Sequence, residues 1–242
     1  MEISERELAR LVRDVDDSHR QGMTTMAADI AELHQGEGAR LRRGPQRTLV
    51  RAAGLGGAAV AIGSVLLPMG RLIGVANAQS GDAGVAAFAE SVELAAVAAY
   101  TAAAQSGKVT TKAVLDAATT FAGHHKEHGA AFGGAAGSAA TGKANQKLLD
   151  AVGPQLQAAA DENAVLEIAY SLENAAAATY LFALGALTSK AALQLTASIL
   201  PVESQHAIVL GTVLGKPATD KTYLPPFQTE DGAVTPDKFP IS

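Results

Sequence analysis

The sequence predicts an all-α protein whose main domain is a four-helix bundle with one long crossover, and three observations lead to it. Hydrophobic residues make up 48% of the 242 residues and aromatic residues only 4%, and an Ala/Leu/Val core suits closely packed helices better than a β-sandwich. Four long segments with helical periodicity follow residue 79, without strand-like alternation between them. The connections are short except between the second and third segments, as in bundles with one crossover.

Residues 1–40 form a charged leader with nine acidic residues and five arginines. Its apolar residues recur at helical spacing and fall on one face of a predicted helix: Leu8, Leu11, Val12 and Val15. We expect His19 and His34 in this leader to be solvated polar residues. The sequence does not indicate the role of the leader.

Residues 41–78 have the three parts of an export signal. Four arginines and no acidic residue occupy residues 41–51, and an apolar run of about 16 residues follows at 52–68. This run is shorter than the roughly 20 residues that span a membrane. Ala76-Asn77-Ala78 then provides a small-x-small cleavage signal. Cleavage after this tripeptide would release the remainder of the chain.

The stretch QRTLVRAAGLGG resembles a twin-arginine (Tat) signal. The pair in the matching register is Gln46-Arg47, and the true Arg42-Arg43 pair lies four residues earlier. The alternative is an uncleaved anchor that associates with the membrane through residues 52–75. Both interpretations place the C-terminal part outside the cytoplasm, in the periplasm, the cell envelope or the medium, because the arginines stay inside.

The bundle is predicted over residues 79–215, and its four long helices span about residues 83–105, 111–131, 156–187 and 190–214. Thr110 is the expected N-cap of the second helix, and Thr188 or Ser189 that of the fourth. A short helix at about residues 145–152 lies in the crossover and is expected to end at Gly153-Pro154.

Residues 216–242 are predicted to form an extended tail. The stretch from Lys216 to Pro240 holds five of the nine prolines and two of the six phenylalanines, so a helix is excluded. We expect Phe227 and Phe239 to anchor the tail across the bundle, with disorder as the alternative.

Polar residues repeat between the two halves of the bundle. The first helix has SVELAAVAAY, with Glu93 followed seven residues later by Tyr100. The third has SLENAAAATY, with Glu173 followed seven residues later by Tyr180. The domain is therefore expected to consist of two copies of a two-helix unit. Each tyrosine is either a core residue with a hydrogen-bonded hydroxyl or a neighbour of a bound metal.

The second and fourth helices each carry a polar pair three residues apart: His125 and His128 in one, Glu203 and His206 in the other. Residues at this spacing share a helix face, so each pair directs two ligands toward one point. A lone carboxylate in an apolar environment is costly to bury without a partner. A central metal removes this cost, and one glutamate from each of two helices with a pair from each of the others is the arrangement of dimetal carboxylate bundles.

Residues 83–214 resemble the ferritin-like superfamily, and within it the bacterial ferritin-like domain proteins, which are grouped with plant desiccation-related proteins. The best-matching stretches are SVELAAVAAY, GHHKEH, SLENAAAATY and ILPVESQHA. The resemblance implies a metal site that binds iron, or manganese or another divalent metal, as one or two ions. Six residues are implied as metal ligands: Glu93, His125, His128, Glu173, Glu203 and His206. Tyr100 and Tyr180 are implied to lie beside the metal.

The sequence departs from the family pattern at His125, where a glutamate is expected. The site therefore has three carboxylates and three imidazoles in place of four and two. Because a neutral imidazole binds one metal while a carboxylate bridges two, a single metal, a mixed pair and weak occupancy all stay open. A second register, which uses His124 and Glu127, does not match the fourth helix and ranks below the first.

Several single residues carry expectations of their own. Glu90, Glu127 and Glu167 are expected to be exposed charges. Pro201 lies two residues before Glu203, inside the fourth helix, where it removes a backbone hydrogen bond at a cost of roughly 3 kcal/mol. We expect it to kink the helix, which would either re-aim Glu203 or mark a site that has drifted.

The charge pattern excludes some functions. From residue 79 onward the chain has fifteen acidic residues, nine lysines and no arginine, which argues against binding to nucleic acid. The absence of cysteine excludes disulfides and thiolate ligands. The first hypothesis is an exported ferritin-like metal-binding protein with oxidase or ferroxidase activity. The alternatives are a non-catalytic structural or stress-protective bundle with a vestigial or single-metal site, and a membrane-tethered partner protein regulated by its leader.

Overall fold

The computed structural model describes residues 3–36, 81–216 and 229–241. In these ranges it contains helices and turns but no β-strand, which confirms the all-α prediction. The helices are α1 (Glu5–Gly36), α2 (Gly81–Gln105), α3 (Lys112–Ala136), the 3-10 turn η1 (Gly137–Ala139), α4 (Gln146–Ala158), α5 (Glu162–Ala186) and α6 (Lys190–Val213). The expected signal or anchor at residues 41–78 lies outside the described residues, so export and membrane association stay predictions.

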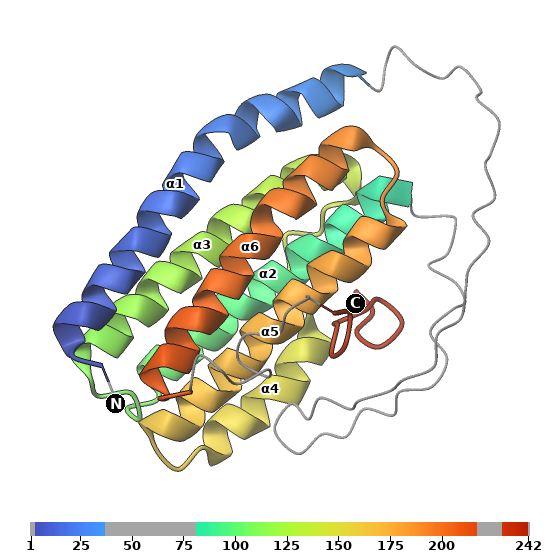
Figure 1. Ribbon diagram of the computed structural model, residues 1–242. Helices are drawn as coiled ribbons and strands as arrows, with labels where there is room; N and C mark the ends of the chain where they lie inside the picture. The colour runs from blue at the N-terminus through green and yellow to red at the C-terminus, as the bar shows by residue number, and fades with distance from the viewer. Residues whose placement is uncertain (1–2, 37–80, 217–228, 242) are drawn as a thin grey trace.

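Helices α2, α3, α5 and α6 form the four-helix bundle (Figure 1). Helix α2 packs mainly against α3, and α5 mainly against α6. The connection from α3 to α5 is the long one, and its helix α4 packs against α2 and α5. The predicted bundle with one long crossover is thus confirmed.

The two units of the bundle are joined by matching contacts at their helix starts. At the beginning of α2, Asp82 accepts hydrogen bonds from the backbone N–H groups of Thr188 (2.9 Å) and Ser189 (2.6 Å), which precede α6. At the beginning of α5, Glu162 accepts one from the N–H of Thr111, before α3, at 2.8 Å. Each carboxylate satisfies N–H groups that a helix start leaves unpaired and interacts favourably with the helix dipole. These contacts extend the predicted twofold repeat.

One predicted helix cap is confirmed and another is displaced by one residue. Ser189 caps α6 as predicted, and its Oγ accepts a hydrogen bond from the N–H of Ala192 at 3.2 Å. The N-cap of α3 is Thr111 rather than Thr110, and its side chain makes no capping bond; its hydroxyl instead donates to Glu162 Oε1 at 2.7 Å. The third bundle helix was predicted to begin near residue 156, but residues 156–158 belong to α4 and α5 begins at Glu162.

Two prolines lie inside helices. Helix α4 continues through Pro154 to Ala158, so the predicted end at Gly153-Pro154 is wrong. Its apolar face, with buried Leu148, Val152 and Leu156 at four-residue intervals, extends past the proline, and packing of this face outweighs the lost hydrogen bond. Helix α6 likewise continues through the exposed Pro201, and the kink expected there stays a prediction.

The leader helix α1 lies along the outside of the bundle and packs against α3 and α6 (Figure 1). Leu8, Val12 and Val15 are buried in the main hydrophobic core, as their shared face predicts. His19 is only 3% exposed, so the expectation that it is solvated is wrong. The reason is that His19 follows Val15 by four residues and therefore lies on the same face. The side chain of His34 lies outside the described residues.

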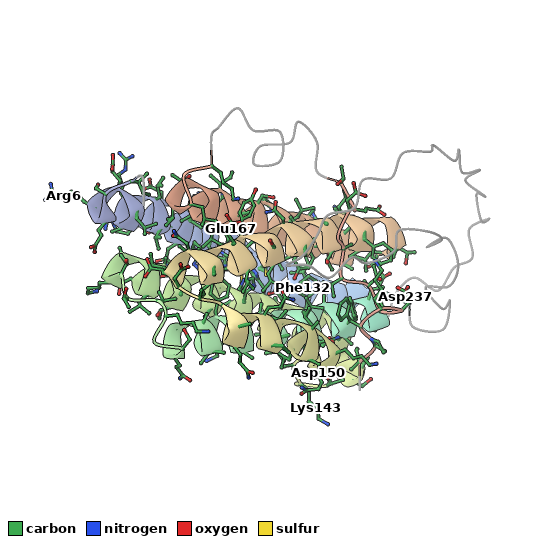
Figure 2. The ribbon with its side chains drawn as sticks, turned by 90° about the horizontal axis from the view of Figure 1, so that it is seen from below. Arg6, Phe132, Lys143, Asp150, Glu167 and Asp237 are labelled. Carbon is green, nitrogen blue, oxygen red and sulfur yellow. The ribbon has the colours of Figure 1, made fainter. Side chains whose placement is uncertain are left out.

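The three glutamates expected on the surface differ in their surroundings. Glu127 and Glu167 are exposed, as predicted, and Figure 2 shows Glu167 on α5. Glu90 is only 6% exposed, so that prediction is wrong. Its carboxylate accepts hydrogen bonds from the backbone N–H groups of Thr141 (2.9 Å) and Gly142 (3.3 Å) in the crossover. A partner distant in sequence therefore compensates its burial.

We expect Glu90→Ala to lower the free energy of unfolding by about 1.5–3 kcal/mol, because hydrogen bonds to a charged acceptor are lost and the crossover is released. Urea denaturation would measure the change. The matched control is Glu167→Ala on the exposed surface of α5, which should change stability by less than about 0.5 kcal/mol. Equal effects of the two substitutions would contradict the role of Glu90.

Residues 229–241 contain no helix or strand; they form two turns, at residues 231–232 and 236–238, and pack against the bundle rather than running fully extended. Val234 is buried, and its N–H donates to Thr179 Oγ1 at 2.8 Å. Phe239 packs against the core as predicted, and its carbonyl oxygen accepts a hydrogen bond from Asn145 Nδ2 at 2.9 Å. Phe227 lies outside the described residues.

In the described part of the chain, one helix, α2, is long and apolar enough to cross a membrane by length and composition. The relevant window of α2 is 61% buried inside the protein. A buried core helix of a bundle has the same composition, and α2 occupies that position here.

Candidate metal centre

The six ligands that the sequence predicts converge in the middle of the bundle from its four long helices. All six are at most 2% exposed: Glu93 on α2, His125 and His128 on α3, Glu173 on α5, and Glu203 and His206 on α6. In each group that could hold a metal, one ligand atom per residue lies within 4.8 Å of the others. The buried cluster of glutamates and histidines could therefore hold a metal ion.

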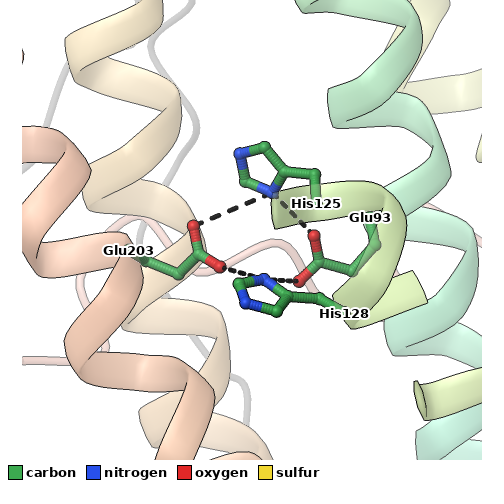
Figure 3. Close-up of side chains that lie close together, drawn as sticks. All are labelled: Glu93, His125, His128 and Glu203. Carbon is green, nitrogen blue, oxygen red and sulfur yellow. Dashed lines mark hydrogen bonds and ion pairs between the residues drawn. The ribbon is translucent and has the colours of Figure 1, made fainter. Parts of the chain in front are cut away.

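The cluster consists of two overlapping groups of four residues. The first is Glu93, His125, His128 and Glu203, and it is drawn in Figure 3. The second is His125, Glu173, Glu203 and His206. His125 and Glu203 belong to both groups, so they lie between two candidate metal positions.

The two oxygens of Glu203 face different halves of the cluster. Oε1 lies 3.0 Å from His128 Nδ1, and Oε2 lies 3.4 Å from His206 Nδ1. A carboxylate in this position can bridge two cations.

His125 also lies between the halves. Its Nδ1 is 2.7 Å from Glu93 Oε2, and its Nε2 is 3.1 Å from Glu173 Oε1 (the contact with Glu93 is drawn in Figure 3). His125, which replaces the glutamate of the family pattern, therefore contacts both halves of the cluster. Its imidazole forms ion pairs with carboxylates where a glutamate would add a fourth negative charge.

The two tyrosines connect the repeat units across the bundle. The hydroxyl of Tyr100 donates to Glu173 Oε1, and the hydroxyl of Tyr180 donates to Glu93 Oε1. Each tyrosine thus contacts the glutamate of the other unit. A buried phenol needs such a partner, and the hydrogen bond holds the carboxylate in one orientation. Both tyrosines lie beside the candidate site, although sequence spacing did not indicate which glutamate each contacts.

The unsatisfied atoms of the cluster fit a metal site. Among the described residues, both oxygens of Glu203 and both ring nitrogens of His128 are buried without a hydrogen bond. The 3.0 Å separation of His128 Nδ1 and Glu203 Oε1 is an ion-pair contact without hydrogen-bond geometry. Buried polar atoms are normally satisfied, and a bound cation would satisfy these.

Without metal, the charges of the cluster compensate one another. Burial lowers the pKa of His128, but its contacts with Glu203 and Glu93 outweigh burial and raise that pKa to about 9. Burial raises the pKa of Glu173, but the imidazoles of His125 and His206 outweigh burial and hold it well below the usual range. The metal-free cluster therefore favours imidazolium–carboxylate pairs.

A further histidine lies behind the cluster, and the sequence did not predict its partners. His124 Nδ1 is 2.9 Å from His206 Nε2, and His124 Nε2 is 3.1 Å from Asp16 Oδ1 on α1. The second register is not supported, because His124 belongs to neither candidate group in the described part of the chain and Glu127 is exposed. Burial and nearby imidazoles, His206 foremost, lower the pKa of His124 to about 4.

An apolar pocket between α2, α4 and α5 extends to the cluster. Alanine, valine and leucine side chains line most of it, and its polar lining residues are Tyr100, His125 and Glu173. A small uncharged molecule in this pocket would contact ligands of the cluster directly.

A four-helix bundle with one long crossover and a buried carboxylate–histidine cluster defines the class of ferritin-like proteins. Residues 81–216 match the family model described as "Ferritin-like domain". The match covers more than half of the chain, and the protein therefore belongs to the ferritin-like domain family. No curated protein and no solved structure matches the chain.

Proposed function

We propose that this ferritin-like protein binds one or two iron ions in the buried cluster and acts as an oxidase or ferroxidase. The observation that carries the proposal is the pair of four-residue groups that share Glu203 and His125. The two oxygens of Glu203 support it, because they are buried without a hydrogen bond, which buried polar atoms normally make.

In the proposed arrangement, each half of the cluster supplies one glutamate and one histidine of its own. Glu93 and His128 would hold one ion, Glu173 and His206 the other, with Glu203 between them. Carboxylate and imidazole donors suit iron and manganese, and the absence of cysteine removes the softer thiolate ligands.

Bound iron supplies one-electron oxidation and dioxygen chemistry that the side chains do not have. The residues of the chain orient and enclose the site. Tyr100 and Tyr180 hold Glu173 and Glu93 in position through hydrogen bonds. The surrounding apolar helices exclude bulk water, and the pocket between α2, α4 and α5 gives small uncharged molecules a path to the cluster.

A non-catalytic structural bundle is the second candidate, and one observation favours it. His125 contacts Glu93 directly at 2.7 Å and Glu173 at 3.1 Å. An imidazolium in this position stabilises the bundle by itself, so the cluster could persist as a buried polar network.

The proposed activity is located outside the cytoplasm, on the strength of the Tat-like segment at residues 41–78. A membrane span through residues 52–75 would separate residues 1–40 from the bundle, and cleavage after Ala78 would remove them. The contact of α1 with α3 and α6 therefore favours a leader that stays attached on the same side as the bundle. Mass-spectrometric sequencing of the N-terminus in the exported fraction tests this. A start at Gln79 supports cleavage, and recovery of the protein only from the cytosol contradicts export.

The metal proposal is tested on the full-length chain, purified without a histidine tag and loaded anaerobically with Fe(II). We expect about one to two bound equivalents, one for each group of ligands, and oxygen-dependent oxidation of the bound iron. Glu173→Ala should weaken binding by about 100-fold or more, because second-sphere losses alone cost 10–100-fold.

The matched control is Glu167→Ala, an exposed glutamate on the same helix, which should bind iron as the wild type does. Negligible iron in the wild-type protein would refute the metal proposal and favour the structural candidate. Stoichiometric binding without oxidation would refute only the oxidase activity.

A further inference from the structure

The leader helix α1 reaches the cluster through a chain of three side chains. His206 directs Nδ1 toward Glu173 Oε2 at 3.3 Å, and its Nε2 points away from the cluster toward His124 Nδ1, 2.9 Å distant. His124 Nε2 lies 3.1 Å from Asp16 Oδ1. A ligand of the candidate centre is therefore connected to a carboxylate at the opposite end of the chain.

The chemistry of the chain determines where its protons lie. An ionised carboxylate only accepts hydrogen bonds, so the contact with Asp16 requires a proton on His124 Nε2. A neutral His124, as its burial favours, then has a lone pair on Nδ1 and accepts a hydrogen bond from His206 Nε2–H. When His206 is neutral, as metal binding requires, its Nδ1 is then without a proton and faces the cluster, which is the form in which an imidazole binds metal.

Neighbouring residues on α1 hold the side chains of Asp16 and His124 in place. The guanidinium of Arg20 contacts both oxygens of Asp16, at 2.7 and 3.2 Å. The ring of His19 stacks on that of His124 with a centroid distance of 3.9 Å. Because Asp16, His19 and Arg20 all belong to α1, docking of this helix is what completes the chain.

We propose that Asp16 is a positioning residue of the metal centre: acting through His124, it orients His206 and selects the tautomer that presents Nδ1 to the metal. The leader helix is then a functional part of the centre. This inference rests on the proposed function, because it requires that His206 binds metal, and it applies to the chain that keeps residues 1–36 attached to the bundle.

The test uses the full-length chain and Co(II), whose electronic absorption reports on its ligands. Asp16→Ala removes the acceptor and should weaken Co(II) binding by about tenfold or more, as losses of such hydrogen bonds to ligating histidines do. The absorption spectrum of bound Co(II) should change as well. Asp16→Asn keeps an acceptor oxygen at the same place and should recover most of the affinity.

The control is Asp17→Ala, the neighbouring exposed residue of α1, which should leave both affinity and spectrum unchanged. A His124→Phe variant should weaken binding as Asp16→Ala does, and the double variant should be no weaker than either, because both act through one chain. Thermal unfolding of each variant shows whether it is folded.

Two results would overturn the inference: Asp16→Ala binding Co(II) with wild-type affinity and spectrum, or Asp17→Ala weakening binding equally. Its failure is distinguishable from that of the proposed function. If Glu173→Ala abolishes binding while Asp16→Ala has no effect, the centre stands and the role of Asp16 fails. If the wild-type protein binds neither Fe(II) nor Co(II), the proposed function fails.

Discussion

Replacing His125 with glutamate is expected to make the stability of the protein depend on bound metal. In the metal-free state this substitution adds a carboxylate between Glu93 and Glu173, where the imidazole now contacts both. Removal of one partner from a buried ion pair costs about 3–5 kcal/mol. Repulsion between the carboxylates adds to this loss, so the metal-free variant should be far less stable than the wild type.

With metal present, the same substitution should have the opposite effect. The introduced glutamate would restore a second bridging carboxylate, and four carboxylates balance the charge of two divalent ions. A ligand at 100 times its dissociation constant adds about 2.7 kcal/mol to stability. We therefore expect Mn(II) or Fe(II) to raise the Tm of His125→Glu by more than that of the wild type, with two ions bound.

Thermal unfolding with chelator and with Mn(II), together with metal analysis, measures both effects. His125→Gln is the matched control, because it removes the imidazole without adding a charge. It should be less stable than the wild type in chelator, and added Mn(II) should raise its Tm by less than that of His125→Glu. A metal-free His125→Glu protein as stable as the wild type would contradict the position of His125 between the carboxylates.

The metal-free protein is expected to be most stable near pH 6.5. The folded pKa values of His124 (about 4) and His19 (about 3) lie below 6.5, mainly because of burial, so protonation of the unfolded chain lowers stability as the pH falls below 6.5. The pKa of His128 rises from 6.5 to about 9 on folding, so its contribution is complete below pH 6.5 and is lost as the pH rises through 9. A shift of this size corresponds to roughly 3 kcal/mol. The pKa of Glu173 is held well below 4.5, so its contribution is present above that pH and is lost under more acidic conditions.

Above pH 6.5, metal affinity should change with pH in the opposite direction to the stability of the metal-free protein. The imidazoles must release their protons before they bind a cation, so Co(II) affinity should increase from pH 6.5 to 9 while the metal-free protein becomes less stable. Urea denaturation in the presence of chelator and Co(II) titration at each pH measure the two trends. His128→Gln should remove much of the alkaline loss of stability, and a wild-type protein that gains stability from pH 6.5 to 9 would refute the charge assignment.

The convergence of the six side chains could be predicted from sequence because its signals are local. The i, i+3 spacing of His125 and His128, repeated by Glu203 and His206, places both members of a pair on one helix face wherever that helix packs. The seven-residue spacing in SVELAAVAAY and SLENAAAATY repeats in the same way, and a lone carboxylate in an apolar helix indicates a buried partner. The resemblance to the ferritin-like family added which helices face one another.

The burial of individual polar residues and their hydrogen-bond partners could not be predicted from the local sequence. Glu90 was expected on the surface, and the crossover buries it by supplying two N–H groups. His19 was expected in solvent, and α1 buries it against α3. In both cases a contact between distant segments reverses what the local sequence suggests.

By itself, then, the sequence determined the four bundle helices, their twofold repeat and the six side chains that converge, because helical periodicity sets the direction of each side chain relative to its own helix. Only the tertiary structure decided that the leader helix docks on α3 and α6, that each tyrosine contacts the glutamate of the other unit, and that Asp16 reaches His206 through His124. These contacts join residues far apart in the chain. They depend on how the helices pack as a whole, and no spacing within one helix encodes them.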